Sequence, residues 1–94
     1  MTDAEIISLI GYASGVMTVA SFIPQALKTY ATKDVSGLSF LMYTFFNLGT
    51  LGWITYGYLR ASYPLMIFNS ITFLFAFPVW IMIIKYHNKE TPLL

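Results

Sequence analysis

Three long stretches without a charged residue constrain this chain more than any other feature of its sequence. They run from Ile6 to Leu27, from Val35 to Leu59 and from Ala61 to Ile84. Each exceeds the roughly 20 apolar residues that a helix needs to cross the hydrocarbon core of a bilayer. Because backbone groups in lipid must be hydrogen-bonded internally, we expect helices and not strands. The sequence therefore predicts an all-α membrane protein with three transmembrane helices.

The segments between these stretches are short, so we expect a single domain over residues 1–94. Its transmembrane helices are predicted at about 5–30, 38–60 and 64–87. Charged residues make up 10 % of the chain, far below the roughly 25 % of soluble domains. The net charge of +1 argues against binding to nucleic acid. With no cysteine and one histidine, we expect no metal, no cofactor and no enzyme activity.

The positions of lysine and arginine predict the orientation of the chain. With three spans, the N-terminus and the second loop share one side, which holds only Arg60. The other side holds the four lysines, Lys28, Lys33, Lys85 and Lys89. Because positive residues favour the cytoplasmic side, we place the N-terminus outside and the C-terminus in the cytoplasm. A lone unit of three helices favours a bacterial inner membrane.

Glycines on two of the expected helices indicate close packing between helices. Gly11 and Gly15 form a small-xxx-small pattern, and Gly49, Gly52 and Gly57 lie in the second stretch. Three helices cannot by themselves surround a path for a solute, so we expect copies of the chain to associate. Since all copies insert in one direction, a two-fold dimer would be parallel, with its axis along the membrane normal.

Trp53 and Asn69 are unusual residues for helices in lipid. Both lie roughly 10–13 Å below the outer loop when the helical rise is counted from Arg60. An indole and an amide at one depth fit a neutral hydroxylated ring such as a sugar, because the ring can stack on the indole while its hydroxyls bond the amide. A core aromatic residue and an interhelical hydrogen bond explain the spacing equally well.

Four further residues would lie at the two ends of such a path. Tyr56 and Arg60 share a helical face with Trp53, so they would line its outer mouth. Arg60 would otherwise extend to the lipid headgroups, as arginines at helix ends commonly do. Phe22 and Met42 are bulky enough to close the inner end, although apolar residues in a membrane need no such role.

Pro24 and Gln25 lie near the inner end of the first stretch. The proline removes one helical hydrogen bond and clashes with the carbonyl of Ala20, and Gln25 could bond a carbonyl released by the kink. Taken alone, both Pro24 and Pro78 are interpreted as tolerated kinks, which are common in membrane helices.

Ionisable residues are missing from the middle of all three stretches. Neither a proton relay nor a buried cation site is therefore evident. A path through this protein would most simply carry a neutral solute down its concentration gradient.

A series of motifs in this order and at these separations resembles the bacterial SemiSWEET family, the half-size members of the SWEET and PQ-loop transporters. The motifs are Ile23-Pro24-Gln25, the loop Thr32-Lys-Asp-Val-Ser-Gly-Leu-Ser39, Met42-Tyr43, Trp53-Ile-Thr-Tyr56-Gly57 and Asn69. The resemblance covers about residues 5 to 87. It implies half of a SWEET, with the third helix packed between the first two, and a parallel homodimer around one central path.

The resemblance also implies a role for each singled-out residue. Sugar would bind to Trp53 and Asn69 of both copies, Tyr56 and Arg60 would form an outer gate, Phe22 and Met42 an inner gate, and Pro24 and Gln25 a hinge. The implied activity is uniport of mono- or disaccharides, of the glucose or sucrose class, by alternating access. One position departs from the family, because some members place an acidic residue two positions after the arginine and this chain has Ser62.

Two other functions are compatible with the sequence. PQ-loop relatives also carry other small metabolites, but a charged cargo would need a fixed countercharge along the path. An accessory membrane protein would explain the glycines, but not the shared depth of Trp53 and Asn69.

Overall fold

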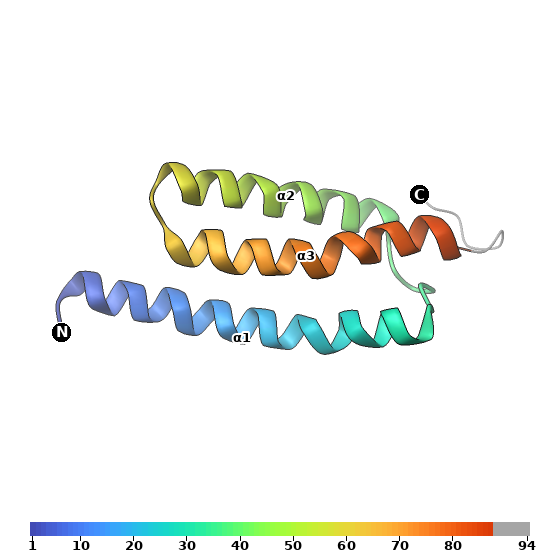
Figure 1. Ribbon diagram of the computed structural model, residues 1–94, viewed down its shortest axis with the longest axis horizontal. Coiled ribbons are helices and arrows are strands. Elements are labelled where there is room, and N and C mark those ends of the chain that lie inside the picture. Colours follow the sequence, from blue (N-terminus) through green and yellow to red (C-terminus); the bar gives the residue numbers. More distant parts are fainter. Residues whose placement is uncertain (88–94) are drawn as a thin grey trace.

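The computed structural model describes residues 1–87 as three α-helices joined by two short loops (Figure 1). The helices are α1 (Asp3–Thr32), α2 (Phe40–Leu59) and α3 (Tyr63–Tyr86). The predicted all-α, three-helix fold is thereby confirmed. Lys89, one of the lysines used to orient the chain, lies outside the described residues. We call the end with the N-terminus and the α2–α3 loop the outer end, and the opposite one the inner end.

Helix α3 lies between α1 and α2 (Figure 1). It packs against both neighbours, whereas no Cα atom of α1 comes within 8 Å of one in α2 over residues 1–87. The expected middle position of the third helix is therefore confirmed. The short α2–α3 loop makes these two helices antiparallel neighbours, and the longer α1–α2 loop leads the chain past α3.

Two of the helices, α1 and α3, are long and apolar enough to cross a membrane by length and composition. Helix α2 contains no charged residue, but it falls short of that hydropathy because residues such as Thr44, Asn47 and Thr50 interrupt its hydrophobic side chains. The hydroxyls of both threonines donate to carbonyls of α2 itself, and the Asn47 amide donates to Tyr43. Its polar groups are thus bonded mostly within the helix, as a membrane environment requires.

The helix ends are capped by local side chains. Thr2 and Glu5 form a reciprocal capping box at the start of α1. Ser39 accepts a hydrogen bond from the backbone N–H of Met42 at the start of α2, with a length of 3.1 Å. At the start of α3, Pro64 lies where its missing N–H costs little. Helix α1 ends at Thr32 and is capped by Lys33, which has a left-handed φ of 57°.

Packing is densest between the inner halves of α2 and α3. Phe73, Phe77 and Trp80 of α3 stack in a row, with 5.2 and 5.9 Å between successive centroids, and Phe40 of α2 stacks on Trp80 at 5.7 Å. The indole N–H of Trp80 donates to the hydroxyl of Thr44 at 2.7 Å. Ala76 and Val79 are completely buried. Helices α2 and α3 therefore form a tightly packed pair, to which α1 is added.

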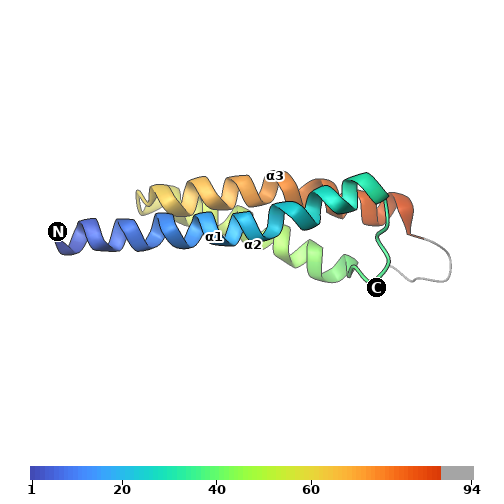
Figure 2. The same cartoon turned by 90° about the horizontal axis from the view of Figure 1, so that it is seen from below.

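Helix α1 is less enclosed, and most of its large apolar side chains are exposed. It remains helical through Pro24 and changes direction within its C-terminal third (Figure 2). Its exposed apolar surface suits contact with lipid or with another copy of the chain.

Candidate functional site

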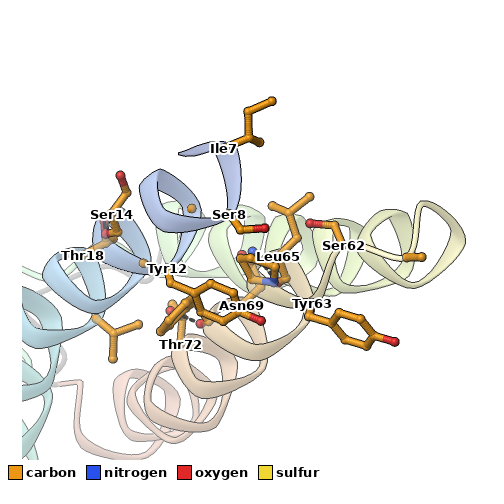
Figure 3. Close-up of a pocket in the computed structure, with 16 residues that line it drawn as sticks. Ile7, Ser8, Tyr12, Ser14, Thr18, Ser62, Tyr63, Leu65, Asn69 and Thr72 are labelled. Carbon is orange, nitrogen blue, oxygen red and sulfur yellow. Dashed lines mark hydrogen bonds between the residues drawn. The ribbon is translucent and has the colours of Figure 1, made fainter. Parts of the chain in front are cut away.

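A cavity of about 480 Å³ lies between the outer halves of α1 and α3 (Figure 3). None of the side chains that line it is charged. Hydroxyl groups and one amide provide its polar lining: Ser8, Tyr12, Ser14, Thr18, Ser62, Tyr63, Asn69 and Thr72. Cavities of this size commonly hold small molecules, and neutral donors and acceptors suit a ligand that is itself neutral and polar.

Asn69 lines this cavity from α3, on the side that faces α1 (Figure 3). Its amide nitrogen donates to the carbonyl of Leu65 at 2.9 Å. Because an amide has two N–H donors and one acceptor, this bond leaves one donor and the acceptor for a ligand. Thr72 lies one turn further along and donates to the carbonyl of Phe68 at 2.8 Å.

Trp53 does not line that cavity. Its side chain is 54 % exposed on α2, and its ring meets the ring of Tyr56 edge-to-face at 5.6 Å between centroids. A single chain therefore does not bring Trp53 and Asn69 into one cavity. The exposed indole belongs to an open surface of α2, where an added Cβ at Gly49 or Gly52 would meet nothing within 4 Å.

The outer end of α2 leads from Trp53 to the short α2–α3 loop. Tyr56 is exposed, and its carbonyl accepts a hydrogen bond from the backbone N–H of Arg60 at 2.9 Å. Ser62 donates its backbone N–H to Gly57 at 2.7 Å and lines the cavity. As a serine it offers Arg60 a hydroxyl but no negative charge.

At the inner end, the structure brings Phe22 to a residue that the sequence did not single out. The ring of Phe22 stacks on that of Phe46, with 6.0 Å between centroids. Met42 lies one turn before Phe46 on the same face of α2 and is half-exposed. In the sequence, the spacing of four residues between Met42 and Phe46 could have indicated that Phe46 lies on the same helical face as Met42.

Pro24 and Gln25 are both exposed on α1. The carbonyl of Gln25 accepts a hydrogen bond from the Thr29 hydroxyl at 3.0 Å. This side-chain hydrogen bond therefore stabilises the helical turn that follows Pro24. The pair thus lies in a continuous helix whose direction changes nearby (Figure 2).

Comparison with known proteins gives a consistent picture. A sequence model of the PQ loop repeat matches residues 6–66. The chain is 33 % identical over 86 residues to a protein of Escherichia coli (strain UMEA 3162-1) named sugar transporter SemiSWEET. The aligned region covers 92 % of this chain and 97 % of that protein. It is 40 % identical over 68 residues to a protein of the same name from Leptospira biflexa serovar Patoc (strain Patoc 1 / ATCC 23582 / Paris), covering 72 % and 80 %.

A solved structure shows the same arrangement of helices. A crystal structure of SemiSWEET in the inward-open conformation matches this chain with a TM-score of 0.84 at 32 % identity, and the match covers 92 % of each chain.

Proposed function

Because the chain belongs to the SemiSWEET group of the PQ-loop family, we propose that it is a membrane carrier of sugars. The named relatives are sugar transporters. In this chain, the observation that supports the proposal is the cavity between α1 and α3, whose lining offers hydroxyls and the Asn69 amide but no charge. Such a lining can exchange hydrogen bonds with a sugar without a countercharge.

The transporting unit is a parallel homodimer. Trp53 is exposed on α2, and the open positions Gly49 and Gly52 let a second copy approach the same surface closely. In the dimer, Trp53 and Asn69 of both copies face one central path and bind a mono- or disaccharide of the glucose or sucrose class. The indole supplies a flat apolar surface and the amide supplies the hydrogen bonds.

Transport proceeds by alternating access between two gates. Tyr56 and Arg60 close the outer end, and Phe22 and Met42, joined by Phe46, close the inner end. Pro24 and Gln25 form the hinge, because a proline weakens a helix where α1 changes direction. Without a charged group along the cavity, movement of the sugar is uniport, with no coupled ion.

The membrane is the bacterial inner membrane, with the N-terminus outside and the C-terminus in the cytoplasm. The orientation is supported by Lys28, Lys33 and Lys85 at the inner end against Arg60 at the outer end.

Ser62 changes how the outer gate closes. Arg60 then rests on Tyr56 or on backbone carbonyls, so the closed outer state has no ion pair and outward-open is favoured. Introducing the carboxylate as Ser62→Asp should therefore bring the outer helix ends together. Distances between spin labels on these ends, compared with and without the substitution, test this expectation. No shift toward closure would contradict it.

Uptake of radiolabelled glucose and sucrose into liposomes tests the assigned site. Wild type should take up at least one sugar, while Asn69→Ala and Trp53→Ala should lose uptake and remain inserted dimers. Leu74→Ala is the matched control, because this apolar residue of α3 is exposed and lies outside the cavity. Normal uptake by both site variants would overturn the assignment. Absence of uptake by the inserted wild-type dimer would favour another small neutral cargo, and after that an accessory role.

A further inference from the structure

Tyr30 connects α1 to the backbone of α3. It follows Pro24 by nearly two helical turns, so it belongs to the segment of α1 on the inner side of the hinge. Its hydroxyl donates a hydrogen bond to the carbonyl of Phe75. Over residues 1–87, this is the only side-chain hydrogen bond between α1 and another helix. Tyr30 is also partly buried against the core cluster.

The accepting carbonyl lies in the turn of α3 that precedes Pro78. Since Pro78 has no N–H, the carbonyl of Leu74 lacks its usual helical donor. The next two carbonyls receive side-chain donors from the two flanking helices: Phe75 from Tyr30 of α1, and Ala76 from Asn47 of α2 at 3.5 Å. Helix α3 is therefore held from both sides at the turn that its proline weakens.

The two flanking helices are held to α3 in different ways. Helix α2 is fixed at its inner half by the stack of Phe40 on Trp80 and by the hydrogen bond from Trp80 to Thr44. On the outer side of Pro24, helix α1 contacts α3 closely at Gly15, where an added Cβ would lie only 2.1 Å from the ring of Phe68. Pro24 separates that contact from Tyr30. Movement about Pro24 would leave the outer contact in place and break the bond at Tyr30.

We propose that Tyr30 is a latch that holds the inner segment of α1 against α3 and thereby sets the balance between the two conformations of this segment. The proposal rests on the hinge in the proposed function. Tyr30 is a positioning residue, because it lies outside the lining of the cavity and acts through its bond to α3. A neutral hydrogen bond contributes about 1 kcal/mol net, so its loss should change the ratio of the two conformations about five-fold.

Tyr30→Phe tests the latch, because it removes the hydroxyl and keeps the ring. The chain has no cysteine, so spin labels can be placed at Ala31→Cys and Ile84→Cys, both exposed at the inner end. Labelled chains diluted with unlabelled chains report the distance within one protomer. The ratio of the longer-distance to the shorter-distance population should rise about five-fold in Tyr30→Phe. Tyr58→Phe removes the same atom from a side chain that is 73 % exposed and should leave the distances unchanged.

An identical distance distribution in wild type and Tyr30→Phe, with equal helix content by circular dichroism, would overturn the latch. The distances are measured without sugar, so the result is independent of the proposed activity. A shifted distribution in a protein that takes up no sugar would support the latch and contradict sugar transport. Sugar uptake by wild type with no shift in Tyr30→Phe would support transport and reject the latch.

Discussion

The ring of Phe22 on α1 stacks on the ring of Phe46 on α2, with 6.0 Å between centroids and 29° between planes. The two helices are separated by α3, and their Cα atoms do not approach within 8 Å over residues 1–87. The two rings therefore bridge a gap that the backbones leave at the inner half of the protomer. Phe46 also meets Tyr43, a buried residue of the core cluster, at 6.3 Å.

This pair of rings should be energetically coupled. Aromatic pairs contribute about 0.5–1.5 kcal/mol beyond the apolar area that they bury. We expect a double-mutant cycle of Phe22→Ala and Phe46→Ala to give a coupling free energy in that range, measured by unfolding in detergent. Phe45→Ala, at a neighbouring ring that is 66 % exposed, should show no coupling to Phe22→Ala. Strict additivity of the Phe22 and Phe46 substitutions would contradict the bridge.

Gly15 should tolerate no side chain as long as the ring of Phe68 stays in its present position. An added Cβ would lie 2.1 Å from the ring of Phe68, so Gly15→Ala must displace that ring or separate α1 from α3. Overpacking of this kind costs about 1–3 kcal/mol. The thermal midpoint in detergent should fall accordingly. Shortening the neighbour with Phe68→Leu should recover part of the loss, and an equal loss in both backgrounds would show that the ring is not the obstacle.

The hydroxyl of Thr44 should stabilise the α2–α3 pair. Thr44→Val keeps the shape of the side chain but leaves the indole N–H of Trp80 without the acceptor that it has at 2.7 Å. Losing the partner of a partly buried donor costs about 1–3 kcal/mol, which denaturant unfolding can measure. Thr55→Val is the control, because the Thr55 hydroxyl bonds only the carbonyl of Leu51 within its own helix. Equal effects of the two substitutions would argue against the role of the Trp80 bond.

The loop between α1 and α2 should show a specific response to pH. The hydroxyl and the backbone N–H of Ser36 donate to the Asp34 carboxylate at 2.5 and 3.0 Å, and these bonds hold the pKa of that carboxyl below its usual value. Because the pKa is lowered, the hydrogen bonds from Ser36 to the ionised carboxylate stabilise the folded protein above the ordinary pKa of about 3.9. This stabilisation is lost as pH falls through the lowered value. An NMR titration of the Asp34 carboxyl should detect this, and Ser36→Ala should raise the pKa; an unchanged pKa would exclude the hydroxyl as its cause.

The fold could be predicted from the sequence because lipid permits few alternatives. Three uncharged stretches and the need to satisfy every backbone group imply three helices, and the structure has them. The three uncharged stretches alone do not predict that α3 lies between its neighbours. We expected that position only because of the family resemblance. The lower hydropathy of α2 follows from polar residues such as Asn47, whose bonds are visible only in three dimensions.

The candidate site could be predicted only in part, since depth in a membrane follows from sequence but rotation about a helix axis does not. Counting residues placed Trp53 and Asn69 at one depth. The structure places Asn69 in the α1–α3 cavity and leaves Trp53 on an open surface, because packing against α3 sets the rotation of α2. Phe46 and Tyr30 were missed for the same reason. Their partners, Phe22 and the carbonyl of Phe75, lie on other helices.

The time course of radiolabelled sugar uptake into sealed liposomes tests the central claim most directly. The liposomes contain wild-type protein and carry an imposed proton gradient, and uptake is followed to its plateau with and without an ionophore that collapses this gradient. A passive sugar carrier predicts uptake of glucose or sucrose faster than in protein-free liposomes, to equal concentrations inside and outside, and no effect of the ionophore. Uptake no faster than in protein-free liposomes would contradict sugar transport. Accumulation above the outside concentration that the ionophore abolishes would contradict uniport.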